Sequence, residues 1–94
     1  MLSANLLDAY DYIIVGGGTA GLVVASRLSE DLHATALVIE AGRDHRDDPP
    51  VSTSGFLSLL CGNDSYDWKF TSTPQPGLNS RALSLARGKG LGGS

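Results

Sequence analysis

A glycine-rich turn between an apolar run and a helical pattern constrains the fold of this chain most. The stretch Gly16–Gly21 has the spacing G-x-G-x-x-G and follows the apolar, β-branched run Tyr12–Val15. This order predicts a strand, a tight turn and a helix. The helix is expected from about Thr19 to Asp31, with apolar contacts from Leu22, Val23 and Leu28. Gly16 permits the turn, Gly18 lets a phosphate approach the backbone, and Gly21 lets the helix pack closely on the strand. The start of such a helix offers N–H groups to an anion.

An acidic residue ends the next apolar run. Ala36–Ile39 has the composition of a buried parallel strand, and the second strand is predicted over residues 35–40. Its last residue, Glu40, lies nineteen residues beyond Gly21. A carboxylate at this place can accept hydrogen bonds from both ribose hydroxyls and repels a 2′-phosphate. The pattern therefore predicts a dinucleotide site for an unphosphorylated adenosine ribose. The alternative is that the glycines form only a turn.

The length of the chain limits what this unit can do alone. The chain has 94 residues, of which 41% are hydrophobic, as is typical of a soluble globular protein. The predicted fold class is α/β, with a Rossmann-like β-α-β unit at about residues 11–42. Because a doubly wound domain needs several further strands, we expect a truncated domain that folds poorly by itself.

Charge and cysteine content exclude several classes of function. The net charge is −3, from seven basic and ten acidic residues, so we expect no nucleic-acid partner. Cys61 is the only cysteine, which excludes an internal disulfide, and its apolar neighbours predict a packed thiol. We see no signal peptide in the first ten residues and no bilayer-spanning apolar run. We therefore expect a cytoplasmic protein with no membrane partner.

The residues after the second strand predict mostly irregular structure. Residues 41–50 are rich in Gly, Asp and Pro and indicate a surface loop. Phe56–Leu60 can form a turn or two of helix. Tyr66–Thr71 alternates large and polar groups like a short strand, and Ser84–Ala86 can be briefly extended.

Three single residues have roles that the sequence leaves open. His33 and His45 are interpreted as solvated loop residues, although His45 with the nearby Asp47 and Asp48 could suggest a metal site. Their spacing matches no metal-binding pattern, so we expect no metal. Trp68 is interpreted as a core or interface anchor, with contact to a cofactor or its channel as the alternative.

Five blocks of sequence occur in the same order in one protein family. They are residues 11–21, 25–30, 37–42, 66–68 and 87–94. In these blocks the chain resembles the amino-terminal part of the glucose-methanol-choline flavoprotein oxidoreductases. Many FAD and NAD proteins share the first block, but the last, with Gly-Lys-Gly-Leu-Gly-Gly-Ser, is much more specific.

The resemblance implies FAD as cofactor. Its ADP half would lie on Gly16–Gly21 with its ribose on Glu40, and the closing glycines would lie near the pyrophosphate and isoalloxazine. Residues 1–94 would then form a partial FAD-binding domain, irregular and flavin-proximal over about 43–94. The cofactor-binding residues predicted in this way are Gly16, Gly18, Thr19, Ala20, Gly21, Glu40, Ala41, Gly92, Gly93 and Ser94.

The resemblance also implies a reaction, in which hydride passes from the CH–OH group of a small-molecule alcohol to the flavin. The family's catalytic histidine and its partner lie far beyond residue 94, and neither His33 nor His45 corresponds to them. We therefore predict no catalytic residue in this chain and no activity of the chain alone. Two alternatives stay open: a fragment of an NAD-dependent dehydrogenase, or a non-redox relative that acts as a cyclase, lyase or interaction module. The alcohol itself is not identified.

Overall fold

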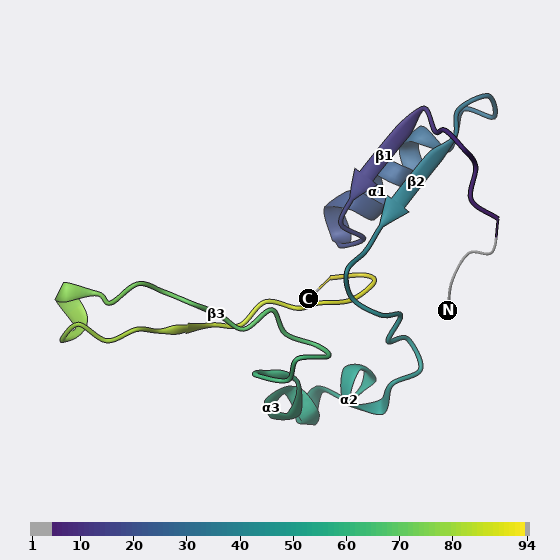
Figure 1. The fold of residues 1–94 in the computed structure, drawn as a ribbon. Helices are drawn as coiled ribbons and strands as arrows, with labels where there is room; N and C mark the ends of the chain where they lie inside the picture. The colour runs from purple at the N-terminus through teal and green to yellow at the C-terminus, as the bar shows by residue number, and fades with distance from the viewer. Residues whose placement is uncertain (1–4, 94) are drawn as a thin grey trace. The chain divides into compact units, whose positions relative to one another are not determined.

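The computed structural model of the chain describes residues 5–93. They divide into two compact units (Figure 1). One consists of the residues up to Asp44 together with the segment that begins at Gly90, and the other is His45–Lys89. The segment 90–93 is thus separated in sequence from the unit to which it belongs.

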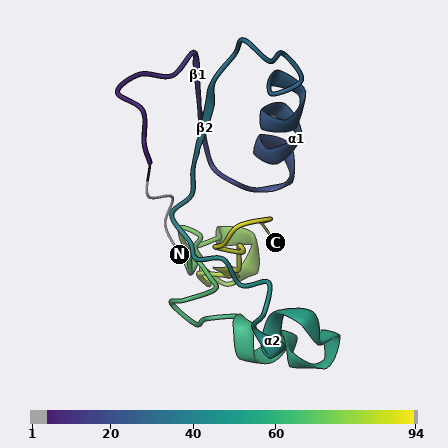
Figure 2. The same ribbon diagram turned by 90° about the vertical axis from the view of Figure 1, so that its right-hand side faces the viewer.

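The first unit is a β-α-β unit. Strand β1 (Tyr12–Val15) pairs in parallel with β2 (Ala36–Ile39), in register from their first residues to their last. Helix α1 (Thr19–Leu28) connects them and packs against both strands (Figures 1 and 2). This arrangement confirms the α/β, Rossmann-like fold expected from the sequence.

A polar contact joins the entrances of the two strands. The Asp11 carboxylate accepts hydrogen bonds from the N–H (2.8 Å) and the hydroxyl (3.0 Å) of Thr35, and the Asp11 N–H donates to Thr35 Oγ1 (3.1 Å). These bonds, the backbone N–H of Thr35 first, lower the pKa of Asp11 below its usual value. The side chain that precedes β1 therefore helps to set the register of the parallel pair.

Helix α1 ends earlier than predicted. The sequence favoured a helix to Asp31, whereas the last helical residue is Leu28. The Ser29 hydroxyl donates to the carbonyl of Ala25 (2.7 Å), and such local side-chain bonds compete with continued helix. The second strand is also one residue shorter at each end than the predicted 35–40.

The two faces of α1 differ in burial. The face toward the strands carries the half-buried Gly21, Ala25 and Leu28. The sequence predicted apolar contacts for Leu22, Val23 and Leu28. Leu28 is half-buried, whereas Leu22 and Val23 are exposed, Val23 by 57%. Within residues 5–93 no hydrophobic side chain is fully buried.

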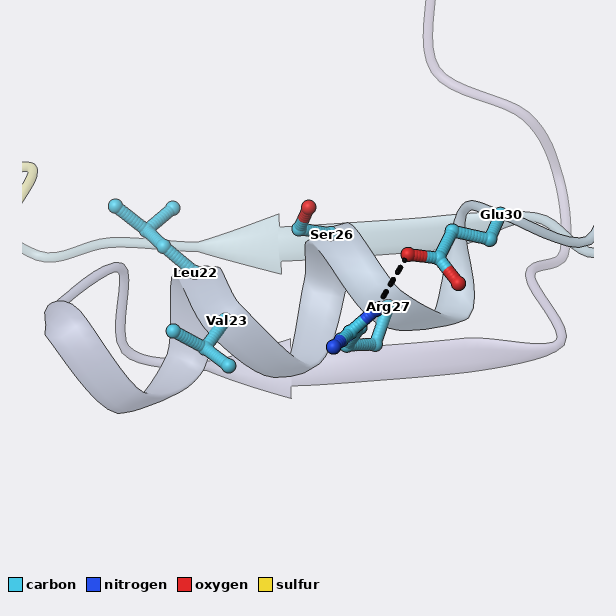
Figure 3. A pocket seen from close by; sticks show the side chains of 5 residues that line it. All are labelled: Leu22, Val23, Ser26, Arg27 and Glu30. Carbon is cyan, nitrogen blue, oxygen red and sulfur yellow. Dashed lines mark hydrogen bonds and ion pairs between the residues drawn. The ribbon is translucent and has the colours of Figure 1, made fainter.

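The outer face of α1 forms a shallow groove, shown in Figure 3. An ion pair of 2.9 Å between Arg27 and Glu30 lies in it. The residues that line the groove are Leu22, Val23, Ser26, Arg27 and Glu30.

The second unit consists of short elements. Strands β3 (Phe70–Thr71) and β4 (Ser84–Leu85) pair antiparallel, so only part of the predicted strand Tyr66–Thr71 forms a ladder. The predicted helix at Phe56–Leu60 is a 3-10 turn (Ser54–Phe56) followed by α3 (Leu57–Leu60). The other elements of this unit are α2 (Pro49–Ser52) and a 3-10 turn at Pro76–Leu78. In the described part of the chain, no helix has the length and apolar character needed to cross a membrane.

A buried carboxylate organises this second unit. Asp67, which is 5% exposed, accepts backbone N–H bonds from Gly62 (2.7 Å), Lys69 (2.9 Å) and Arg87 (2.9 Å). These three donors lower the pKa of Asp67 below its usual value. Lys69 takes a left-handed backbone conformation (φ +55°), which interrupts the extended run that the alternating sequence predicted.

Candidate functional site

The turn between β1 and α1 depends on glycine at both ends. Gly16 has a φ of +104°, which strongly favours glycine, and its N–H donates to the carbonyl of Ile39 (2.7 Å). A β-carbon at Gly21 would lie 2.0 Å from the carbonyl oxygen of Gly16 and 3.3 Å from a methyl group of Ile14. The predicted roles of these two glycines, a tight turn and close helix–strand packing, are confirmed.

The start of α1 presents its N–H groups at the end of this turn. Gly18 is the N-cap, and the N–H of Leu22 makes the first helical bond to its carbonyl (2.9 Å). No described side chain caps the helix, and its first turn has no acidic residue. The N–H groups of Thr19, Ala20 and Gly21 therefore have no acceptor within the helix, an arrangement that favours an anion.

Glu40 lies at the same edge of the sheet as the start of α1. One carboxylate oxygen accepts the N–H of Gly17 (2.7 Å), and the other accepts the N–H of Gly42 (2.8 Å). Both oxygens are thus fixed beside the glycine-rich turn without any ligand. Carboxyl ends of parallel strands are where nucleotides bind in this kind of fold.

The glycine-rich segment Gly90–Gly93, called the closing segment below, lies against the turn between β1 and α1. The N–H of Leu91 donates to the carbonyl of Arg43 (3.0 Å), and the N–H of Gly92 donates to the carbonyl of Gly17 (2.7 Å). Gly92 also forms a parallel bridge with Gly18. A β-carbon on Gly93 would lie 3.2 Å from the α-carbon of Gly18. Two glycine-rich segments more than seventy residues apart thus lie against each other.

The structure brings most of the predicted cofactor-binding residues together. Gly16–Gly21, Glu40, Gly92 and Gly93 share this edge of the unit, and Ala41 is exposed next to Glu40. Ser94 lies outside the described residues. Sequence reasoning missed Gly17, Arg43 and Leu91. The signal for Gly17 was the unbroken glycine triplet at 16–18, because the fingerprint leaves its second position free.

His45 is not the solvated residue that the sequence predicted. It is 5% exposed, its Nδ1 lies 2.8 Å from a carboxylate oxygen of Asp48, and its Nε2 lies 3.1 Å from the carbonyl of Ser65. Its ring lies 4.5 Å from the ring of Tyr66, whose hydroxyl donates to the same oxygen of Asp48 (3.0 Å). Both ring nitrogens face acceptors, so His45 has a packing role in the second unit. Among residues 5–93 no group of three His, Cys, Asp or Glu side chains could hold a metal ion.

Two other predictions concern single side chains of the second unit. Cys61 is exposed, so the expectation of a packed thiol was wrong. Its apolar neighbours Leu59 and Leu60 lie in α3, which has no buried residue. Trp68 is 45% exposed, stacks on Phe70 with ring centroids 6.0 Å apart, and has the ammonium of Lys89 5.1 Å from its ring. It is therefore not a core residue of its unit, and its contact with an interface or a cofactor stays a prediction.

Sequence comparison finds relatives among dehydrogenases, although no family model matches the chain. A dehydrogenase of Armillaria gallica is 50% identical over 90 residues, covering 89% of this chain and 14% of that protein. An oxygen-dependent choline dehydrogenase of Staphylococcus saprophyticus is 48% identical over 88 residues, covering 93% of this chain and 16% of that protein. The chain thus spans about one seventh of the length of the relatives it matches.

Solved structures give the same result for the fold. Pyridoxine 4-oxidase from Mesorbium loti superposes with a TM-score of 0.76 at 42% identity, over 92% of this chain and 16% of that one. An FAD-dependent oxidoreductase from Chaetomium thermophilum superposes with a TM-score of 0.72 at 39% identity, over 90% of this chain and 14% of that one. At these identities the likeness covers sequence and fold together. The chain is therefore the counterpart of the amino-terminal part of the glucose-methanol-choline family of FAD-dependent oxidoreductases.

Proposed function

We propose that this chain forms the adenosine-binding part of an FAD site in an oxidoreductase that acts on the CH–OH group of a small-molecule alcohol. One observation carries the proposal. The start of α1 and the carboxylate of Glu40 lie at one edge of the sheet, on either side of the same glycine-rich turn. This pairs a place for phosphate with a place for ribose hydroxyls. The names of the relatives, which include a choline dehydrogenase, support the alcohol as donor.

The donor and acceptor groups present fit the ADP half of FAD. The first N–H groups of α1 can donate to the diphosphate. Each carboxylate oxygen of Glu40 accepts one backbone N–H and retains a lone pair for a ribose hydroxyl. The negative charge of Glu40 disfavours a 2′-phosphate at this place. When bound, FAD would supply the acceptor for the hydride that leaves the alcohol carbon.

In this proposal the chain's own residues bind and orient the cofactor and do not transfer protons. His45 has both ring nitrogens engaged and is buried, so it cannot reach a substrate hydroxyl as a base. We accordingly place the catalytic residues outside residues 1–94. We also propose that residues 11–42 hold the adenosine end while part of 43–94 lies near the flavin. The cytoplasmic location stays a prediction.

The competing NAD assignment is less well supported. Glu40 and the helix start serve NAD and FAD equally well, since both contain an ADP half. The closing segment at Gly92 and Gly93 lies against the turn, and the nicotinamide fingerprint gives no reason for such a second glycine-rich segment. No described feature favours a non-redox role.

The test uses the protein as its gene encodes it. We expect the purified protein to show the absorption bands of bound flavin, to bind FAD and ADP, to bind NAD more weakly than FAD, and to reject NADP. With FAD bound, a panel of primary alcohols should reduce an artificial electron acceptor. Preferential binding of NAD, or no binding of either FAD or ADP, would overturn the proposal.

A further inference from the structure

We propose that Gly17, the position that the fingerprint leaves free, is a positioning residue that locks the closing segment Gly90–Gly93 onto the glycine-rich turn. The inference rests on the proposed function where it concerns FAD, because it names the contact that sets the two glycine-rich segments relative to each other. Its structural part concerns only the chain's own atoms.

The backbone of Gly17 is engaged on both sides. Its N–H donates to Glu40 Oε2 (2.7 Å), and its carbonyl accepts the N–H of Gly92 (2.7 Å). Gly17 is buried, unlike Gly16 and Gly18, which are half-buried. One peptide segment therefore connects the carboxylate assigned to the ribose with the closing segment.

The space beside Gly17 is filled from the same two directions. A β-carbon there would lie 3.0 Å from Leu91 Cδ1, 3.3 Å from the β-carbon of Glu40 and 3.4 Å from Glu40 Oε2. At Gly18, by contrast, the nearest described atom would be the α-carbon of Gly93 at 3.7 Å, an ordinary contact. Within the protein itself, an added methyl group is therefore harder to place at position 17 than at position 18.

The flexible side chain of Leu91 is the first that would yield. Rotation of Leu91 away from an alanine at position 17 would remove its packing on the turn and loosen the Gly92 bond beside it. The Glu40 side chain has less freedom, because both carboxylate oxygens are held by backbone N–H groups. Gly17→Ala should therefore disturb the closing segment more than β1 or α1.

The experiment compares Gly17→Ala, Leu91→Ala and the double variant in the protein as its gene encodes it. We expect Gly17→Ala to weaken FAD binding roughly tenfold, and the same change to cost clearly less when Leu91 is already alanine, because contacting residues couple. Hydrogen exchange of the ligand-free proteins gives the second readout. Exchange of the Gly92 amide should be faster in Gly17→Ala and in Leu91→Ala than in the wild type.

Gly55→Ala is the matched control, since a β-carbon there meets nothing within 4 Å. It should leave both FAD binding and Gly92 exchange unchanged. The proposed role of Gly17 would be overturned if Gly17→Ala weakened FAD binding equally in the wild-type and Leu91→Ala backgrounds. It would also be overturned if hydrogen exchange of the Gly92 amide were unchanged in both single variants. A wild type that binds neither FAD nor ADP would refute the proposed function instead, and the exchange of Gly92 would still decide whether the lock exists. Leu91→Ala keeps that measurement available if Gly17→Ala does not fold.

Discussion

Replacing Glu40 with glutamine tests the candidate site in both its ligand-free and its ligand-bound states. The carboxylate accepts two backbone N–H bonds, from Gly17 at 2.7 Å and Gly42 at 2.8 Å. The amide of glutamine keeps one acceptor oxygen, and its NH2 group can only donate. Whichever way the amide turns, one N–H loses its acceptor and faces a second donor.

The magnitude follows from these two bonds. A hydrogen bond to a charged group contributes about 1.5–3 kcal/mol, and the remaining bond becomes neutral and weaker. We expect Glu40→Gln to lower the free energy of unfolding without ligand by about 2 kcal/mol, which is on the order of 1 M in the urea midpoint. Loss of the charge toward the ribose hydroxyls should also weaken ADP and FAD about tenfold or more.

The assay is urea unfolding of the protein as its gene encodes it, with and without FAD, together with titration by ADP. Glu30→Gln is the control, because it makes the same chemical change in an exposed ion pair with Arg27 and should shift stability by less than about 0.5 kcal/mol. Equal urea midpoints for Glu40→Gln and wild type would show that the two hydrogen bonds of Glu40 do not stabilise the ligand-free protein. Equal ADP affinity would refute the ribose role, so the two claims can fail separately.

Three further substitutions test other parts of the chain. Gly21→Ala places a methyl group 2.0 Å from the carbonyl oxygen of Gly16, so it should destabilise the β-α-β unit by about 3 kcal/mol or abolish soluble expression, as thermal unfolding would show. Asp67→Asn should lower the melting temperature at neutral pH. Since the pKa of Asp67 is lowered on folding, its contribution is present above the usual carboxyl pKa and is lost as the pH falls through the folded value, so the variant and wild type should converge in acid. Gly18→Ala should leave the melting temperature within about 2 °C of the wild type while weakening ADP binding, and a loss of stability without a loss of ADP affinity would contradict its assignment.

The β-α-β unit could be predicted from the sequence because its signals are local. The β-branched run at Tyr12–Val15 gave the bounds of β1, and the glycine fingerprint gave the start of α1 at Thr19. The end of α1 could not be read from periodicity. It depends on the Ser29 hydroxyl, which bonds the carbonyl of Ala25, and apolar spacing carries no information about that bond.

The second unit was hard to predict because side chains from loops hold it together. His45 bonds to Ser65, twenty residues away, and Asp67 bonds to Arg87, also twenty residues away. Read locally, the polar stretch around His45 indicates a solvated loop, and Asp67 lies in a run that predicts a short strand. Both side chains are buried because they form hydrogen bonds with backbone groups far away in sequence, as buried polar side chains normally do.

The contact between the two glycine-rich segments could be predicted from the sequence only in part. Its place near the cofactor was implied by the family resemblance, but its chemistry was not. The bond from Gly92 to Gly17 and the packing of Leu91 on the turn follow from the path of the chain through Arg43, which no periodic pattern encodes. A fingerprint describes what the ligand requires of the loop and leaves out what another segment of the protein requires.

The three glycines of the fingerprint therefore have different reasons to be glycine. Gly16 needs a positive φ, and Gly21 has a carbonyl oxygen where its β-carbon would be. Gly18 has an ordinary extended backbone, with a φ of −81°, and a β-carbon there would meet the described atoms only at 3.7 Å. Neither backbone conformation nor packing within residues 5–93 demands glycine at this position. We therefore propose that a ligand requires glycine at position 18, and the ligand that best fits the start of a helix is a phosphate.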